Sequence, residues 1–293
     1  MAGFSPSRRV FLTGAAVVGI SAIATQGGAL AEPARRPELR TRLAGAPVSR
    51  ASVRAWERRR VPIAAARLMR DYPEVAVGEL YALVDRGTVG PSDLPAARAA
   101  LARTRASLGA DRIREMLETE TAIAAAATLA AKAASGGRWA IADTEITSQR
   151  GTAEGMMEWF ARERATDDRP TWTGACPDHY VIVTGRDGRQ EVIEVTGGAV
   201  LPLRFFVDYT DVRGVPIPRD PSYPLEIAGT ASLATGEMIG GVRHQFRDLP
   251  GGGFRSRLRV AFPAAVPGPY ITEHQWHLAA EFGNWIDGYL ASV

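Results

Sequence analysis

The sequence predicts an α+β fold, with a helical N-terminal region followed by an antiparallel sheet and a long C-terminal helix. Three observations predict it. Helical periodicity dominates as far as Gly137, short alternating segments separated by Gly and Pro follow, and an apolar stripe with helical spacing lies near the end of the chain. Strands and helices do not alternate, so the pattern excludes a Rossmann-type parallel sheet.

Composition and charge narrow the class of protein. The 293 residues include 35 Lys and Arg against 32 Asp and Glu, and 46% are hydrophobic, which is typical of a globular chain. This near balance argues against a nucleic-acid partner, because a phosphate-binding face needs a dominant basic stripe. The single cysteine, Cys176, excludes a disulfide framework and a cysteine-rich zinc site. A metal would therefore be held by histidines and carboxylates.

Residues 1–31 predict a twin-arginine signal peptide. Arg8 and Arg9 precede a weakly apolar stretch, and the small residues Ala29 and Ala31 suit cleavage. We therefore expect export by the twin-arginine pathway. Because the apolar stretch is short and rich in Gly and Ala, we expect no stable membrane span in the mature chain. An uncleaved N-terminal anchor is the alternative. Removing the two arginines lowers the formal net charge from +3 to +1.

The next segments are predicted to be a leader and a helical region. Residues 32–60 are rich in Arg and Pro and predict a leader that merges into a helix near Ala51. Residues 61–137 contain no histidine and no cysteine, which favours a scaffold or an arm for homodimerisation. Residues 138–293 are expected to form a metal-binding α+β domain. Helices are expected over 52–71, over 74–85, from Asp93 onward, and from beyond Asp111 to Gly136.

Three hairpin-like units are predicted before the last helix. They pair residues 179–184 with 189–196, add a strand over 200–209, and pair 238–247 with 254–262. The last helix is expected over 272–289, and its apolar stripe would pack on the sheet. The stripe consists of Leu278, Phe282, Trp285 and Tyr289.

The last helix also carries a histidine and a carboxylate at metal-ligand spacing. His277 and Glu281 are four residues apart, so they lie about one turn apart on the same face. That spacing suits two ligands of one metal ion. A surface His–Glu pair is the alternative, because this spacing is common in helices.

The first hairpin supplies a second such pair. If its loop has two or four residues, His179, Val181 and Val183 share a face with Val192 and Glu194, and a valine-rich face is buried. A buried carboxylate must be paired or bound to a metal. A three-residue loop would instead place Glu194 on the exposed face.

His244 is the third inward-facing histidine. It alternates with Val242 and Phe246 in the last hairpin, which makes it either a core residue or a pocket residue. Together, two histidines and two carboxylates are sufficient for a catalytic zinc ion, with Fe(II) less favoured.

The order of the motifs resembles that of the 2,4-diacetylphloroglucinol hydrolases and the related phloretin hydrolases. These are zinc enzymes that hydrolyse a carbon–carbon bond between an acyl group and a polyhydroxylated aromatic ring. The resemblance covers roughly residues 138–290. It is carried by Gly155–Phe160, Trp172, Cys176–His179, Val192–Val195, Val242–His244, Arg255–Arg257 and His277–Glu281.

The resemblance implies zinc ligands at His179, Glu194, His277 and Glu281. It also implies a helix-grip fold, in which the last helix lies across a curved sheet as in the birch-allergen family, and a helical region used for dimerisation. The neighbouring His274 is an alternative ligand to His277.

For the reaction, an aromatic small molecule is the expected partner. His244 is the candidate acid/base, because an inward imidazole can titrate near neutral pH, and Tyr209 is the candidate partner of a phenol oxygen. The alternative function is an exported, non-catalytic binding protein for an aromatic or lipid ligand.

Overall fold

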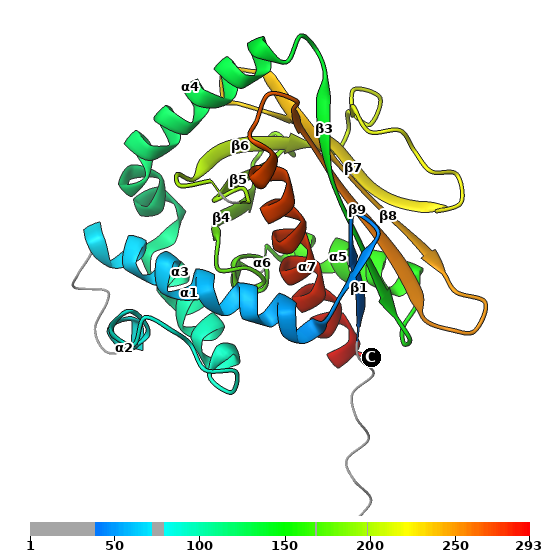
Figure 1. The fold of residues 1–293 in the computed structure, drawn as a ribbon, viewed down its shortest axis with the longest axis horizontal. Helices are drawn as coiled ribbons and strands as arrows, with labels where there is room; N and C mark the ends of the chain where they lie inside the picture. The colour runs from blue at the N-terminus through cyan, green and yellow to red at the C-terminus, as the bar shows by residue number, and fades with distance from the viewer. Residues whose placement is uncertain (1–38, 72–78, 168, 198) are drawn as a thin grey trace, which may run out of the picture. The chain divides into compact units, whose positions relative to one another are not determined.

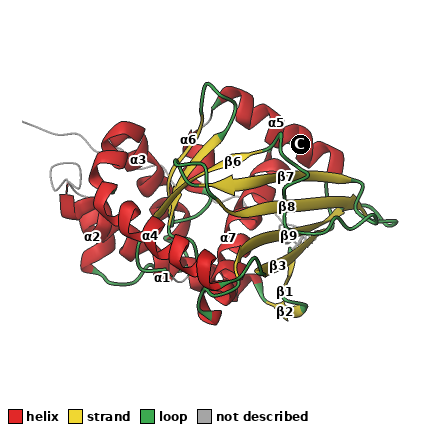
Figure 2. Cartoon of the chain, turned by 90° about the horizontal axis from the view of Figure 1, so that it is seen from above, coloured by secondary structure: helices red, strands yellow, loops and turns green. Residues whose placement is uncertain are grey.

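The structure is a computed structural model that describes residues 39–71, 79–167, 169–197 and 199–293. These residues form a nine-stranded antiparallel sheet with helices packed on it, which confirms the α+β class (Figures 1 and 2). The strand order is β2-β1-β3-β9-β8-β7-β6-β5-β4. The signal peptide predicted over residues 1–31 lies outside the described residues.

The strands are β1 (Arg40–Leu43), β2 (Ala46–Val48), β3 (Trp139–Ser148), β4 (His179–Thr184), β5 (Gln190–Glu194), β6 (Leu203–Asp208), β7 (Leu225–Ser232), β8 (Met238–Asp248) and β9 (Phe254–Pro263). The helices are α1 (Arg50–Asp71), α2 (Glu79–Asp85), α3 (Leu94–Met116), α4 (Glu118–Ala134), α5 (Ala153–Thr166), α6 (Arg169–Gly174) and α7 (Gly268–Ala291). None of the described helices combines the length and the apolar content needed to cross a bilayer.

Residues 39–60 differ from the leader expected over 32–60. They form the β1–β2 hairpin at the sheet edge and the start of α1. Thr41 and Leu43 are buried, whereas Arg40 and Arg42 are exposed on the other face. The alternation of exposed and buried residues in β1 is only four residues long, and its exposed residues are arginines. The composition of this segment therefore resembles that of a linker.

The described part of the helical region agrees with the expected pattern except at one junction, and the expected start of the second helix at residue 74 lies outside the described residues. Gly109 adopts a left-handed φ of 76°, which interrupts α3, and α4 begins only at Glu118 rather than just beyond Asp111. A glycine takes this conformation without the steric cost that a Cβ would bring. Helices α5 and α6 were not predicted, because short polar and glycine-rich segments surround them.

Helices α1–α3 pack on one face of the β4–β5 hairpin. Leu68 of α1 and Leu101 of α3 share a buried apolar cluster with Tyr180, Val181 and Ile193 of the hairpin. These helices are therefore held against the sheet by the same chain. The homodimer expected for this region stays a prediction.

Helix α7 packs on the opposite face through the predicted stripe. Leu278, Phe282, Trp285 and Tyr289 all belong to the main core, together with Phe246 and Leu258 of the sheet. The helix also contacts β3, and its His277 reaches His179 on β4, although these strands lie far apart in the strand order. The sheet must curve around α7 to allow both contacts, as Figure 1 shows.

Candidate metal centre

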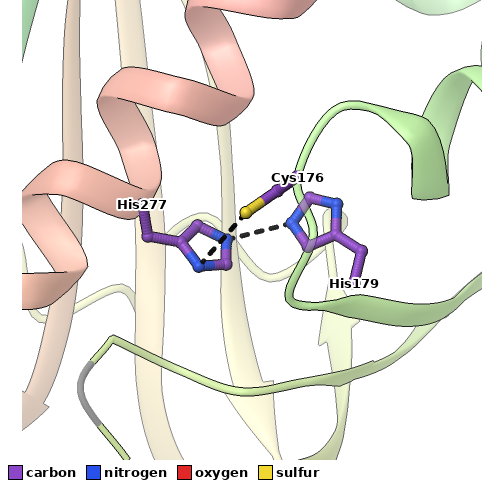
Figure 3. A group of neighbouring side chains, drawn as sticks. All are labelled: Cys176, His179 and His277. Carbon is purple, nitrogen blue, oxygen red and sulfur yellow. Dashed lines mark hydrogen bonds between the residues drawn. The ribbon is translucent and has the colours of Figure 1, made fainter. Parts of the chain in front are cut away.

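Four predicted ligands meet where α7 crosses the β4–β5 hairpin. The Nε2 atoms of His179 and His277 are 3.0 Å apart (Figure 3). Glu194 Oε2 lies 3.6 Å from His179 Nε2 and 3.7 Å from His277 Nε2. Glu281 oxygens lie 3.6 Å and 3.9 Å from the same two nitrogens. The structure therefore brings together the histidine–carboxylate pair of the hairpin and the pair of the last helix.

A β-bulge brings His179 and Glu194 onto one face of the hairpin. The loop between the paired Thr184 and Gln190 has an odd number of residues, which alone would place the two side chains on opposite faces. The register shifts between His179 and Val181, and beyond this shift His179 pairs directly with Glu194. The expected even-numbered loop is wrong, and one inserted residue compensates for it.

The same bulge moves two valines away from the centre. Val181 pairs with Ile193, and both pack against the helices, with Val183 beside them. Ile182 and Val192 take the inward positions in the main core. The expectation that Val181 and Val183 share a face with Glu194 is therefore wrong.

Hydrogen bonds at the far side of each imidazole orient its Nε2 toward the centre. His179 Nδ1 lies 3.1 Å from the carbonyl oxygen of Trp172. A carbonyl can only accept, so Nδ1 carries the proton and Nε2 of the neutral ring carries a lone pair. His277 Nδ1 lies 3.8 Å from the Cys176 thiol. Such outer contacts are typical of metal-binding histidines.

Burial favours the neutral form of all four side chains, because it lowers the pKa of each histidine and raises the pKa of each glutamate. It lowers the pKa of His179 to about 3 and lowers that of His277 as well, with a further contribution from His179. It raises the pKa of Glu194 to about 8, and burial and the nearby Glu194 raise the pKa of Glu281. Two neutral imidazoles can keep their nitrogens 3.0 Å apart only with a proton or a cation between them.

The donor set fits a cation better than a shared proton. Ligand atoms about 2.0–2.2 Å from a tetrahedral zinc ion lie about 3.3–3.6 Å from one another. The nitrogen–oxygen separations of 3.6–3.9 Å and the nitrogen–nitrogen separation of 3.0 Å bracket that range. Two buried carboxylates would also supply the charge that a divalent ion needs.

Two further side chains lie close enough to be considered as ligands. Cys176 forms a compact donor group with His179 and His277, and His274 forms one with Glu194 and His277. The Cys176 sulfur faces the Nδ1 side of His277, and burial raises the pKa of its thiol, which disfavours a thiolate. The structure places His277 rather than His274 beside His179, although His274 is buried one turn away.

A cavity of about 900 Å³ opens beside this centre. Glu194 and Glu281 line it, and apolar side chains form most of its remaining wall. Helix α4 contributes small residues such as Ala124 and Ala127, and α5 contributes Phe160. A cavity of this size and composition is typical of a site for a small organic molecule.

Both residues expected to act on a substrate face this cavity. His244 is 8% exposed, its ring lies 4.7 Å from that of Phe282, and no described residue bonds to its Nδ1. The Tyr209 hydroxyl donates a 2.8 Å hydrogen bond to Gln190 Oε1, and burial raises its pKa. Gln190 was not singled out in the sequence, because nothing in its own pattern marks it as a cavity residue.

Burial lowers the pKa of His244 to about 3, whereas a value near neutrality was expected. His244 is therefore neutral at pH 7, and the depressed pKa makes stability fall with acid. The unfolded chain binds a proton near pH 6.5 and the folded chain does not, so this part of the stability is complete above pH 6.5 and is lost as the pH falls toward 3.

We expect His244→Leu to remove part of this acid sensitivity. Between pH 7.5 and pH 4.5, the variant should lose about 2–3 kcal/mol less of its free energy of unfolding than the wild type does. Urea titrations at the two pH values measure the difference. Equal losses in both proteins would contradict a neutral, buried His244.

The chain matches no protein-family model and no curated protein. The distances between the four donor side chains and the adjacent cavity are therefore the basis for assigning a function to the site.

Proposed function

We propose that the chain is an exported, zinc-dependent hydrolase that cleaves the carbon–carbon bond between an acyl group and a polyhydroxylated aromatic ring. The observation that carries the proposal is the convergence of His179, Glu194, His277 and Glu281 beside a 900 Å³ cavity, which the two carboxylates line. The curved sheet around α7 supports a helix-grip domain, and the N-terminal sequence pattern supports the twin-arginine route.

The four residues would hold the ion, with zinc favoured over Fe(II) by the mixed imidazole and carboxylate donors. A bound zinc ion supplies Lewis-acid activation of a carbonyl group and of water. The protein supplies the remaining functions, which are proton transfer, orientation of the ring and exclusion of bulk solvent.

His244 is suited to move one proton twice. His244 is neutral in the free protein, and its pKa of about 3 makes it a weak base there. In the proposed relay it accepts the proton of a ring hydroxyl, and the phenolate formed beside it stabilises the imidazolium, which then donates that proton to the ring carbon that bears the acyl group. Water then adds to the acyl carbonyl, the carbon–carbon bond breaks, and its electron pair returns to the ring. The proton released by the added water restores the ring hydroxyl, so the products are one carboxylic acid and one polyphenol.

Tyr209 and Gln190 are suited to orient the ring. Their hydrogen bond fixes the Tyr209 hydroxyl in the cavity wall, and the Arg164 guanidinium lies 5.4 Å from the centre of the Tyr209 ring. Burial keeps this phenol protonated, so it can donate to a phenol oxygen of the substrate only if it releases Gln190. It accepts a hydrogen bond from a ring hydroxyl without any rearrangement.

The test is product release from an acylated 1,3,5-trihydroxybenzene by the zinc-loaded protein. We expect equimolar carboxylic acid and trihydroxybenzene, measured by chromatography, and at least about a 100-fold lower rate in His244→Gln. Binding of the ketone without release of acid would contradict the proposed hydrolase.

The second candidate is a non-catalytic binding protein for an aromatic or lipid ligand. The mainly apolar cavity is the observation that favours it. It predicts that the ketone raises the thermal unfolding midpoint and is recovered intact.

A further inference from the structure

A second group of polar side chains lies on the cavity wall. His274 and Thr196 are each 3% exposed, and both line the cavity. No described residue forms a hydrogen bond with either ring nitrogen of His274. Buried polar atoms in folded proteins nearly always have a partner, so these nitrogens indicate a bound group.

Tyr270 completes this group. Tyr270 is partly buried and its phenol lies beside the Thr196 side chain. Desolvation raises the pKa of Tyr270 to about 12, and the interaction with Thr196 lowers the pKa in part. Thr196 Oγ1 makes no hydrogen bond of good geometry with a described residue. Both hydroxyls therefore keep hydrogen-bonding capacity for a ligand in the cavity.

The His274 ring is held in place by its neighbours. It stacks on the His277 ring with 5.0 Å between centroids, and the edge of Phe262 lies 4.9 Å away. Gly197 also lies so close to the backbone of His274 that a Cβ there would clash with it. Because the ring is held in one orientation, its nitrogens can bind a polar ligand group only at a defined position in the cavity.

The two histidines outside the metal centre line the same cavity and contact α7 at different turns, and His244 is close enough to His274 to lower the pKa of His274. His274 precedes His277 by one turn, and the His244 ring lies against Phe282, the residue after Glu281. Eight residues of α-helix span about 12 Å. A substrate whose carbonyl lies at the centre and whose ring lies beside His244 would extend its acyl chain toward His274.

The charges around this group disfavour an anion. Arg164 is the one Lys or Arg among the described cavity-lining residues, and it lies over the ring of Tyr209. The carboxylate of Glu194 lies close to His274 instead. A neutral hydroxyl or carbonyl can bond to the imidazole and to both hydroxyls without facing like charge.

We propose that His274, Thr196 and Tyr270 form a second polar subsite, which binds a neutral hydroxyl or carbonyl group carried by the acyl chain of the substrate. This inference rests on the proposed function, because that function places the aromatic ring at the His244 end. It assigns the substrate class as aryl ketones with a polar acyl chain.

Two probes that differ in one group test the subsite without turnover. They are 2-(4-hydroxybutyl)- and 2-pentyl-1,3,5-trihydroxybenzene, which lack the carbonyl and differ only in a terminal hydroxyl or methyl. Calorimetric titration of the zinc-loaded full chain should show about tenfold tighter binding of the hydroxybutyl probe, the value of one hydrogen-bonded group. In His274→Leu and Thr196→Val the preference should fall at least about threefold.

Thr128→Val is the matched control. Thr128 lines the cavity from α4 and its hydroxyl bonds to the Ala124 carbonyl, so the preference should stay at the wild-type value. Equal binding of the two probes by the wild type would overturn the subsite and leave the hydrolase proposal intact. Loss of zinc from His274→Leu would also overturn it, because His274 would then be a ligand. Failure of both probes to bind would overturn both proposals.

Discussion

Replacing His277 with alanine should remove the metal from the protein. The purified wild type is expected to carry about one zinc per chain, and His277→Ala should lower the zinc affinity by at least about 100-fold, because the remaining imidazole and carboxylates then form an incomplete shell. Glu194→Ala should have a similar effect, since its oxygen lies within 3.7 Å of both ring nitrogens. Elemental analysis after dialysis against a weak chelator measures the metal content.

His244→Ala serves as the control for these variants. It removes an imidazole from the same cavity without removing one of the four converging donors, so it should retain the metal. Glu281→Gln keeps the shape of its side chain and separates loss of a ligand from loss of folding. A wild-type protein without bound transition metal would refute the metal centre, as would full zinc content in His277→Ala.

Arg60→Leu should destabilise the protein by about 3–5 kcal/mol, the cost of leaving a buried charge without its partner. Arg60 Nε and Nη2 bond to both oxygens of Asp178, at 2.9–3.1 Å, and Asp178 is 1% exposed. Burial raises the pKa of Asp178, and Arg60 is the largest influence that opposes the rise. Chemical denaturation at pH 7 measures the loss.

An exposed arginine of the same helix provides the comparison. Arg70 pairs with Glu120 but is 51% exposed, so Arg70→Leu should cost less than about 1 kcal/mol. Adding Asp178→Asn to Arg60→Leu should recover part of the stability, because the uncompensated charge is then absent. Equal losses in the two arginine variants would show that the Arg60–Asp178 pair is not a buried anchor between α1 and the residue before His179.

The sequence was most informative where all the residues of a pattern lie in one helix. The stripe from Leu278 to Tyr289 predicted the buried face of α7, and the spacing of His277 and Glu281 predicted that both side chains point the same way. Nothing beyond the helical repeat was needed for either inference.

The β4–β5 hairpin shows why pattern alone was insufficient. The prediction that His179 lies opposite Glu194 depended on the length of the loop. The assumed four-residue loop is one residue too short, and the bulge shifts the register of the strand by one further residue. Two errors of register cancelled at this pair and remained at Val181 and Val183. The sequence around His179 gives no signal for this bulge, and its residues Tyr180 and Val181 pack against helices that are distant in the sequence.

The edge hairpin and the subsite were beyond sequence reasoning for a different reason. Thr41 and Leu43 become inward residues only because β1 pairs with β3, about one hundred positions later. The nitrogens of His274 indicate a binding site only because no described residue forms a hydrogen bond with them. Both depend on tertiary neighbours and not on the adjacent sequence.

His179 and His277 are 98 positions apart in the sequence, which has a consequence for when the proposed metal could be acquired. Neither the β4–β5 hairpin nor α7 alone provides more than two of the four donors, so high-affinity capture must wait until α7 docks on the sheet. If the four residues hold a metal, metal loading would report that folding is complete. If the chain crosses a membrane already folded, the metal supply of the compartment in which it folds, and not that of its destination, determines which ion it carries.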